Sequence, residues 1–352
     1  MPLSMPVTWS EAHRLHAPET AVWIGMSIAA DELPERADLI RTELEAAGAP
    51  VVAARPHADD ALLAVHDGGL VDFLRSAWKD WEDSGLAEDQ PRVVGYIFPT
   101  PGLLSGLDPR TPEALSARTG AWCYDTMTVV ARGTWTAARG AVDAALTAAD
   151  LVLGGERAAY ACCRPPGHHV TRSAFGGSCY LNNAAVVGQY LRDRGVERVA
   201  VLDLDAHHGN GAQAIFWERG DVFTGSVHVD PAAGWFPHFL GFASETGAGP
   251  GSGANRNLPL APGSGDEAWL EAVETLAADL ATDALVVALG VDAAEADPES
   301  PLRMTADGFR AAGRVLGRLG RPTVLVQEGG YDLPTLGRLV RATLEGFEEG
   351  AS

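Results

Sequence analysis

The stretch from Arg198 to Gln213 constrains the fold more than any other part of the chain. Residues 199–202 are Val, Ala, Val and Leu, an apolar run typical of a parallel strand that is covered on both faces. Asp203, Asp205 and His207 follow at alternate positions, and such side chains point to one side of an extended segment. Open α/β sheets bind ligands at the carboxyl ends of their strands. The stretch therefore predicts a strand that leads into a site, with a solvated, helix-capping turn as the alternative.

Strand patterns and helix patterns alternate along the chain. We expect strands at 51–54, 158–163, 199–202, 222–229, 284–290 and 323–327, and helices at 33–47, 134–153, 182–194, 267–281, 305–319 and 333–348. Residues 61–81 indicate two short helices, residues 7–16 a short edge strand followed by a loop, and residues 244–257 a glycine-rich loop. This alternation predicts one α/β domain over 1–352, an open, mostly parallel sheet with helices on both faces. Each polar motif follows a strand, which indicates one site at one edge.

Composition limits the setting in which the protein works. Hydrophobic residues make up 46% of the 352, which is enough for a large core. The sequence has no apolar run of 18 residues and no signal-peptide pattern at its start, so we expect neither a membrane span nor secretion. Four cysteines without a Cys-x-x-Cys pair suit a reducing cytoplasm better than a disulfide framework.

The chain is strongly acidic. Its formal net charge is -21, and Lys79 is the only lysine among 26 basic residues. Such a field repels nucleic acid and anionic membranes and attracts cations. We therefore expect a small cationic substrate and neither nucleic acid nor membrane as a partner, although solubility alone is an alternative explanation of the charge.

Residues 85–120 form an unusually long connection. Prolines and glycines alternate there with apolar residues such as Tyr96, Ile97 and Leu103. Long connections in compact domains are usually functional or disordered. The apolar content predicts a packed rim of the site and a subunit contact, hence a homodimer or higher homo-oligomer. A plain surface loop is the alternative.

Three residues after strands could hold a metal ion. Asp205, His207 and Asp292 would supply two carboxylate oxygens and one nitrogen and leave a coordination position open, as in catalytic rather than structural zinc sites. The same donors also accept Fe²⁺, Co²⁺ or Mn²⁺, so the residues alone leave the ion open. Water bound to such a metal has a pKa near ~7 and is a nucleophile at neutral pH.

Further polar residues suggest proton transfer. His168 and His169 end a predicted strand and are suited to acid–base chemistry, with Asp203 and Asn210 as candidate partners that set their tautomers. Tyr331 follows two glycines, and its hydroxyl could donate to a developing oxyanion. Taken singly, a histidine pair is also a common structural hydrogen-bonding feature, and such a tyrosine is commonly a packing residue.

Five motifs occur in the order found in one enzyme family. They are Arg-Pro-Pro-Gly-His-His (164–169), Gly-Gly-Ser-Cys-Tyr-Leu-Asn-Asn (176–183), Asp-Leu-Asp-Ala-His-His-Gly-Asn-Gly (203–211), Leu-Gly-Val-Asp (289–292) and Glu-Gly-Gly-Tyr (328–331). They resemble the zinc-dependent histone deacetylase family, which has the arginase/deacetylase fold. Residues 13–16, 236–247 and 257–260 resemble its bacterial acetylpolyamine amidohydrolase branch in particular.

The resemblance implies a role for each matching residue. One zinc ion per subunit would be held by Asp205, His207 and Asp292. His169, bonded to Asn210, would be the general base and acid, His168 would pair with Asp203, and Tyr331 would polarise the amide carbonyl. The acyl tunnel would be lined by Gly177 and Phe236, with Asp125 at its rim. A structural potassium ion would be bound through Asp203, Asp205, His207, Ser226 and the backbone near Val227.

One residue departs from the family pattern. Ser178 stands opposite Phe236, where the family usually carries an aromatic side chain, so the tunnel is expected to be wider. The resemblance implies a deacetylase that removes an acetyl or other small acyl group from an amine, a linear amide, most simply a small acetylated polyamine. The alternatives are a protein acetyl-lysine deacetylase, an arginase-type ureohydrolase, which would need a carboxylate where Gly209 stands, and a protein that binds acylated amines without turnover.

Overall fold

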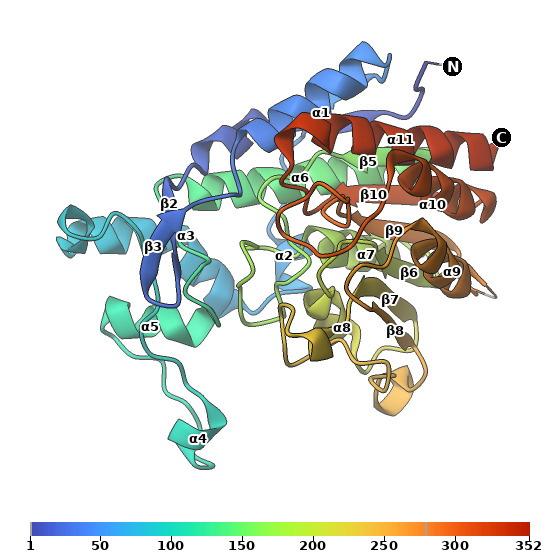
Figure 1. The fold of residues 1–352 in the computed structure, drawn as a ribbon. Coiled ribbons are helices and arrows are strands. Elements are labelled where there is room, and N and C mark those ends of the chain that lie inside the picture. The colour runs from blue at the N-terminus through green and yellow to red at the C-terminus, as the bar shows by residue number, and fades with distance from the viewer. Residues whose placement is uncertain (1, 279) are drawn as a thin grey trace.

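The computed structural model describes residues 2–278 and 280–352. Its centre is an eight-stranded sheet in which every pairing of neighbours is parallel (Figure 1). The strands, in spatial order, are β4 (Val51–Ala53), β1 (Val7–Trp9), β5 (Ala158–Ala161), β10 (Thr323–Gln327), β9 (Ala284–Leu289), β6 (Val199–Asp203), β7 (Val222–Val229) and β8 (Asn255–Leu260). The predicted α/β fold with a mostly parallel sheet is therefore confirmed.

Helices cover both faces of the sheet. One face packs against α1 (Glu35–Ala46), α9 (Asp266–Ala277), α10 (Ala306–Arg318) and α11 (Leu333–Ala351). The other packs against α2 (Asp60–Leu63), α3 (Gly68–Asp83), α6 (Thr134–Leu153), α7 (Asn183–Asp193) and α8 (Asn210–Phe216). Among the helices of the described residues, none is both long enough and apolar enough to cross a membrane.

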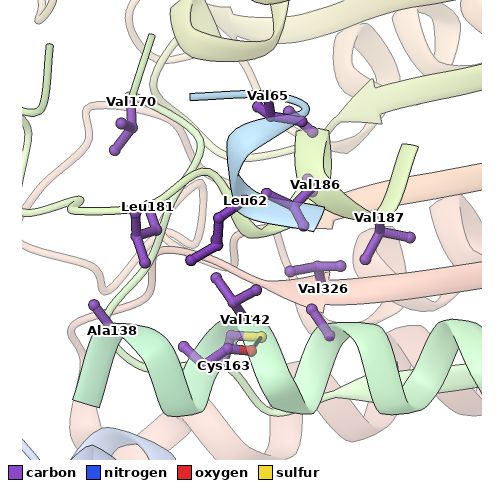
Figure 2. Packing of buried hydrophobic residues seen from close by; sticks show 14 of the residues in the cluster. Leu62, Val65, Ala138, Val142, Cys163, Val170, Leu181, Val186, Val187 and Val326 are labelled. Carbon is purple, nitrogen blue, oxygen red and sulfur yellow. Dashed lines mark hydrogen bonds between the residues drawn. The ribbon is translucent and has the colours of Figure 1, made fainter. Parts of the chain in front are cut away.

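The two cores follow from the alternation of side chains along the strands. In β6, Val199 and Val201 belong to one buried cluster, whereas Ala200 and Leu202 belong to the other. Both sets are apolar because both faces are covered, which explains the continuous apolar run in the sequence. Figure 2 shows part of the first cluster, to which Leu62 of α2, together with residues of α6, α7 and β10, contributes.

The expected helices are present, with ends that differ by a few residues; two local predictions need correction and one element was missed. The strand near residue 7 is not at the edge, because β1 lies between β4 and β5. The predicted loop 244–257 overlaps β8, an edge strand whose Pro259 disguises it in the sequence, since proline is tolerated only at sheet edges. A separate antiparallel hairpin, β2 (Thr20–Trp23) and β3 (Met26–Ala29), was not predicted.

Residues 61–81 do form two helices, as expected, but the glycine pair begins the second helix rather than separating the two. Asp67 caps α3 by accepting a hydrogen bond from the amide of Gly69 at 2.7 Å. A single Asx cap therefore sets the boundary that the glycines only suggested.

Residues 85–120 contain two short helices, α4 (Pro101–Leu104) and α5 (Leu115–Trp122). Figure 1 shows the segment reaching away from the sheet, with α4 at its tip. Several of its apolar side chains are exposed, among them Tyr96, Leu103 and Leu107. An apolar surface of this kind in a monomer usually marks an interaction site.

We expect the buried cluster of Figure 2 to carry much of the stability, and α2 offers a matched pair. Leu62 is 0% exposed and its neighbour Leu63 is 46% exposed. Leu62→Ala should lower the free energy of unfolding by ~2–5 kcal/mol, because it removes buried methyl groups and leaves a cavity. Leu63→Ala should change it by ~0.5 kcal/mol or less. Urea unfolding followed by circular dichroism measures both, and equal effects would contradict the assignment.

Candidate active site

The candidate site lies at the carboxyl ends of four adjacent central strands, β5, β10, β9 and β6. Because all pairings are parallel, the segments that follow these strands meet at one edge of the sheet. Residues 164–169 follow β5, residues 204–209 follow β6, Asp292 follows β9 and residues 328–331 follow β10. The four motifs that lie far apart in the sequence are thus brought together by the sheet order.

Asp205, His207 and Asp292 converge on one point. The Nδ1 atom of His207 lies 3.1 Å from Asp205 Oδ1 and 3.0 Å from Asp292 Oδ2. An imidazole nitrogen carries one proton, so it cannot satisfy both carboxylates fully. The two aspartates are fully buried, and burial of two like charges requires a compensating cation. The donor set therefore fits a divalent metal ion, two oxygens and one nitrogen.

The charges of this cluster are strongly coupled. Burial, together with the nearby charge of Asp205, raises the pKa of Asp292 to about 7. Burial opposes the charged form of His207, but its hydrogen bonds to Asp205 and Asp292 raise the pKa of the ring well above its ordinary value. The raised pKa values of Asp292 and His207 share one cause besides the effect of burial, which is an excess of negative charge that the side chains of this cluster do not neutralise.

Asp203 does not join this set. The strand ends at this residue and the backbone bends over residues 205–207, so the expected single row of alternate side chains is not maintained. Asp203 Oδ2 instead accepts from His168 Nδ1 at 3.0 Å. A Cβ atom at Gly209 would lie 2.2 Å from Asp203 Oδ2, so the carboxylate that a ureohydrolase would need at position 209 would displace Asp203 from its present place.

His168 and His169 lie side by side, with ring centroids 3.9 Å apart. His169 Nδ1 lies 2.6 Å from Asn210 Oδ1, and Asn210 Nδ2 donates to the carbonyl of His169 at 3.1 Å. The amide orientation places the proton of His169 on Nδ1 and leaves Nε2 free to accept. Burial, with the rings of His168 and His207 nearby, holds the pKa of His169 well below its ordinary value. His169 is therefore a neutral base.

His168 has the opposite character. Although burial disfavours its charged form, the carboxylates of Asp205 and Asp203 raise the pKa of His168 to about 10. Two neighbouring imidazoles thus differ widely in pKa, because burial and the nearby histidine rings lower the pKa of His169 whereas the carboxylates of Asp205 and Asp203 raise that of His168. This division is the arrangement expected of an acid–base site.

Glu328 is a site residue that sequence reasoning missed. Its Oε2 atom accepts from the backbone amides of Gly167 and His168, at 2.6 and 3.1 Å, and so holds the loop that carries the histidine pair. The side chain is fully buried, and burial raises the pKa of Glu328 to about 8. The signal was present in Glu-Gly-Gly-Tyr, where only the tyrosine received a role.

Tyr331 is positioned by two charged side chains that were also missed. The guanidinium of Arg36 lies 4.5 Å from the centre of the Tyr331 ring and donates to the carbonyls of Glu328 and Gly330, at 2.7 and 2.6 Å. Asp297 Oδ2 accepts from the backbone amide of Tyr331 at 2.6 Å. In the sequence, Arg36 has the pattern of an ordinary helix residue, so only the packing reveals its role.

Gly177, Phe236 and Asp125 are brought together as expected, but Asp125 is not free to grip a ligand with its whole carboxylate. It accepts from the backbone amides of Gly177 and Thr128, at 2.6 and 2.8 Å, and from the Thr128 hydroxyl at 3.1 Å. Gly177 has φ +60°, and a Cβ atom there would lie 2.3 Å from the ring of His169 and 3.0 Å from that of Phe236. Asp125 therefore positions the backbone that packs against the His169 ring.

A cavity of about 640 Å³ opens over these groups. Tyr331, His169 and His207 lie along it, Phe236 and Ser178 line it as predicted, and none of its described lining residues is lysine or arginine. Three acidic residues, Asp31, Asp125 and Glu299, line it. None of the residues described along it belongs to 85–120, so the prediction that this segment forms the rim of the chain's own tunnel is not supported.

The remaining predicted residues, Ser226 and Val227, lie on β7 beside β6. Ser226 is the register partner of Asp203, and its hydroxyl contacts His228 Nδ1 at 2.8 Å and the amide of Gly209 at 3.4 Å. Val227 is fully buried. The structure therefore places Ser226 beside Asp203, with Val227 next along the same strand.

Comparison with known proteins agrees with this geometry. The sequence matches the histone deacetylase domain over residues 30–347. The chain belongs to the histone deacetylase family. It is 40% identical to the acetylpolyamine amidohydrolase of Mycoplana ramosa and 39% identical to acetylpolyamine amidohydrolase 1 of Pseudomonas aeruginosa, in both cases over 97% of this chain and 99% of the relative.

A solved structure supports the same family at the level of the backbone. The crystal structure of the acetylpolyamine aminohydrolase from Burkholderia pseudomallei superposes with a TM-score of 0.93 at 38% identity and covers 99% of both chains. The predicted relationship to the histone deacetylase family is thus confirmed in sequence and in fold.

The close approach of Gly177 to His169 gives a direct test of the site in this member of the histone deacetylase family. Gly177→Ala should lower kcat by ~10² because the added methyl group displaces the His169 ring by about 1 Å. Gly195→Ala is the matched control, since Gly195 also has positive φ, at +90°, but no atom within 4 Å of its Cβ position. Both variants lose stability from the positive φ, and Gly177→Ala should lose more because its methyl group is also overpacked; a similar loss of kcat in the two folded variants would contradict the role given to the contact.

Proposed function

We propose that the protein hydrolyses the amide bond of small N-acylated amines, and acetylated polyamines in particular, with the help of one divalent metal ion. The observation that carries this proposal is the convergence of a three-residue metal-ligand set, a neutral histidine and a tyrosine on a single cavity. The names of the relatives support the reaction class.

The metal we propose is zinc, held by Asp205, His207 and Asp292, although Fe²⁺, Co²⁺ or Mn²⁺ would fit the same donors. When bound, such an ion polarises a carbonyl group and lowers the pKa of coordinated water to about 7. The chain's own contribution is to hold three ligands and leave the cavity side accessible to substrate.

His169 supplies the proton transfer. Its Nε2 atom is free to accept a proton from the attacking water, because Asn210 Oδ1 fixes the other proton on Nδ1. The same atom then delivers that proton to the departing amine, which leaves as a free base or ammonium. His168, held by Asp203, adds positive charge beside the oxyanion that forms between these two steps.

Tyr331 supplies the second interaction with the oxyanion. Burial holds the pKa of its phenol well above the ordinary value, so the hydroxyl keeps its proton and can donate it in a hydrogen bond. The contacts of Arg36 and Asp297 fix the loop that carries the ring. A preorganised donor of this kind stabilises the transition state more than the bound substrate.

The lining of the cavity supports a cationic substrate. Asp31, Asp125 and Glu299 place negative charge along it, and the overall net charge is -21. Phe236 offers an apolar wall for the methylene chain between the two nitrogens of a polyamine. An ammonium group at the far end of that chain would be attracted by the acidic lining.

Two structural features complete the proposal. A potassium ion would be bound next to the catalytic metal through Asp203, Asp205, His207, Ser226 and the backbone near Val227. The in-register placement of Asp203 and Ser226 supports this site.

The exposed apolar side chains of residues 85–120 support the use of this segment as a subunit contact, and hence a homodimer or higher homo-oligomer.

We also propose the cytoplasm as the place of action. The four cysteines are free and buried, as a reducing compartment would keep them. None of them is needed by the proposed chemistry.

Two variants separate metal binding from transition-state stabilisation. Tyr331→Phe should lower kcat by ~10²–10³ with KM and zinc content nearly unchanged, because it removes one donor to the oxyanion. Asp292→Ala should lose most of its zinc, since the ligand set falls to two. Zinc is measured by atomic absorption alongside the kinetics, and a Tyr331→Phe enzyme within a few-fold of wild type would exclude the phenol from catalysis.

The substrate is tested by comparing kcat/KM for acetylputrescine, an acetyl-lysine peptide and a neutral N-alkylacetamide. We expect acetylputrescine to be preferred, and its kcat/KM to fall with added salt while that of the neutral amide does not. A tenfold or greater preference for the peptide would favour the protein deacetylase alternative and leave the metal-dependent chemistry intact.

A further inference from the structure

Tyr124 lies beside the proposed base but outside the set of residues that the proposed chemistry uses. Its hydroxyl donates a hydrogen bond to the backbone carbonyl of His169 at 3.1 Å. Tyr124 is not among the described residues that line the main cavity. Any effect of its hydroxyl on the reaction must therefore pass through the residues that it contacts.

The carbonyl of His169 receives two hydrogen bonds. One comes from Asn210 Nδ2 at 3.1 Å and the other from the Tyr124 hydroxyl, so both lone pairs of the oxygen are used. Burial raises the pKa of Tyr124 well above its ordinary value, so the phenol keeps the proton that it donates. The backbone amide of Tyr124 in turn donates to the carbonyl of Phe175 at 3.1 Å, which fixes the residue at its own end.

The ring of Tyr124 also packs against the loop that confines the His169 ring. A Cβ atom at Gly176 would lie 2.3 Å from the Tyr124 ring, and one at Gly177 would lie 2.3 Å from the His169 ring. Two glycines in a row allow the backbone to approach both rings closely. Asp125, next to Tyr124, accepts from the amide of Gly177 at 2.6 Å, so two consecutive residues hold this loop against the histidine.

Phe236 completes the contact on the cavity side. Its ring lies nearly parallel to that of Tyr124, with centroids 6.4 Å apart and an angle of 20° between the planes. The same ring meets His169 edge-on, with centroids 4.8 Å apart. Tyr124 thus contacts the backbone of the proposed base, the glycine loop beside that base and the aromatic wall of the cavity.

We propose that Tyr124 is a positioning residue for the amide hydrolysis, whose hydroxyl fixes the backbone of His169 and so keeps the imidazole in place along the cavity. This inference rests on the proposed function and adds a residue to it. A general base must lie within hydrogen-bond reach of the proton that it accepts, and a displacement of about 1 Å can cost a factor of ~10² in rate.

The experiment compares Tyr124→Phe with wild type, both loaded with zinc, on acetylputrescine. This variant removes one oxygen atom and keeps the ring with its packing. We expect kcat to fall by about tenfold, with KM and zinc content within about twofold of wild type, because the base is misplaced while the cavity and the metal ligands are intact.

Tyr190→Phe is the matched control. The Tyr190 hydroxyl also makes one hydrogen bond, to Asp150 Oδ1 at 2.7 Å, and joins helices α7 and α6 away from the cavity. We expect this variant to keep the kcat of wild type. The loss of one tyrosine hydroxyl is thereby separated from the loss of the contact with His169.

A second background distinguishes positioning from a general structural role. In His169→Ala there is no imidazole to position, so adding Tyr124→Phe should lower the residual kcat by less than about twofold. The residual rate is measured with enzyme in excess over acetylputrescine. A general structural role would instead lower kcat by the same factor with and without the imidazole.

Gly176→Ala tests the same contact from the other side. The φ of Gly176 lies outside the left-handed region, so the added methyl group acts through its clash with the Tyr124 ring. We expect kcat to fall by about tenfold or more with unchanged zinc content, since the ring and its hydroxyl are displaced together.

The outcomes separate this inference from the proposed function. A Tyr124→Phe enzyme with the kcat of wild type, or an equal loss in the wild-type and His169→Ala backgrounds, would overturn the role of Tyr124 alone. Absence of turnover on every acylated amine by the zinc-loaded wild-type enzyme would overturn the proposed function and this inference with it.

Discussion

The structure depends on the burial of two carboxylates at the ends of neighbouring strands. Asp205 and Asp292 follow β6 and β9, which pair directly, and both are shielded from solvent. Isolated, each charge would cost several kcal/mol to desolvate, and side by side they repel. A cation at this point would remove both costs. The parallel sheet brings the two carboxylates together, and the covered faces keep them away from water, so both features favour the binding of an ion here.

Ionisable side chains that contact main-chain atoms, rather than substrate, fix the positions of the site residues. Glu328 holds the amides before the histidine pair, Arg36 holds the carbonyls before Tyr331, and Asp125 holds the amide of Gly177. The contacts of Arg36 are charge-assisted hydrogen bonds in a water-poor setting, stronger than their neutral counterparts. These hydrogen bonds hold loops that have no regular secondary structure. Acid–base chemistry requires such positioning, because the reacting groups must stay within hydrogen-bond distance.

From the sequence alone, the features that depend on residue type and on hydrophobic periodicity could be predicted. The apolar run before Asp203 predicted a central strand, which is present, and the residue types of Asp205, His207 and Asp292 predicted a metal-ligand set, whose three side chains the structure brings together. The sequence could not reveal Arg36, since a charged residue in a helix is ordinarily solvated and only tertiary packing buries this one, whereas Glu328 stands in a motif that the sequence does show. The hairpin of β2 and β3 is a local pairing, but its strands of four residues each are too short for periodicity to identify.

The edge strand β8 has a consequence for how copies of this protein can meet. A parallel sheet with a bare edge could continue into a second molecule by main-chain pairing. Pro259 in β8 has no amide hydrogen to offer such a strand, and the opposite edge, β4, is only three residues long. Both edges of the sheet are therefore poor templates for main-chain pairing with a second copy, which favours association through side-chain surfaces instead.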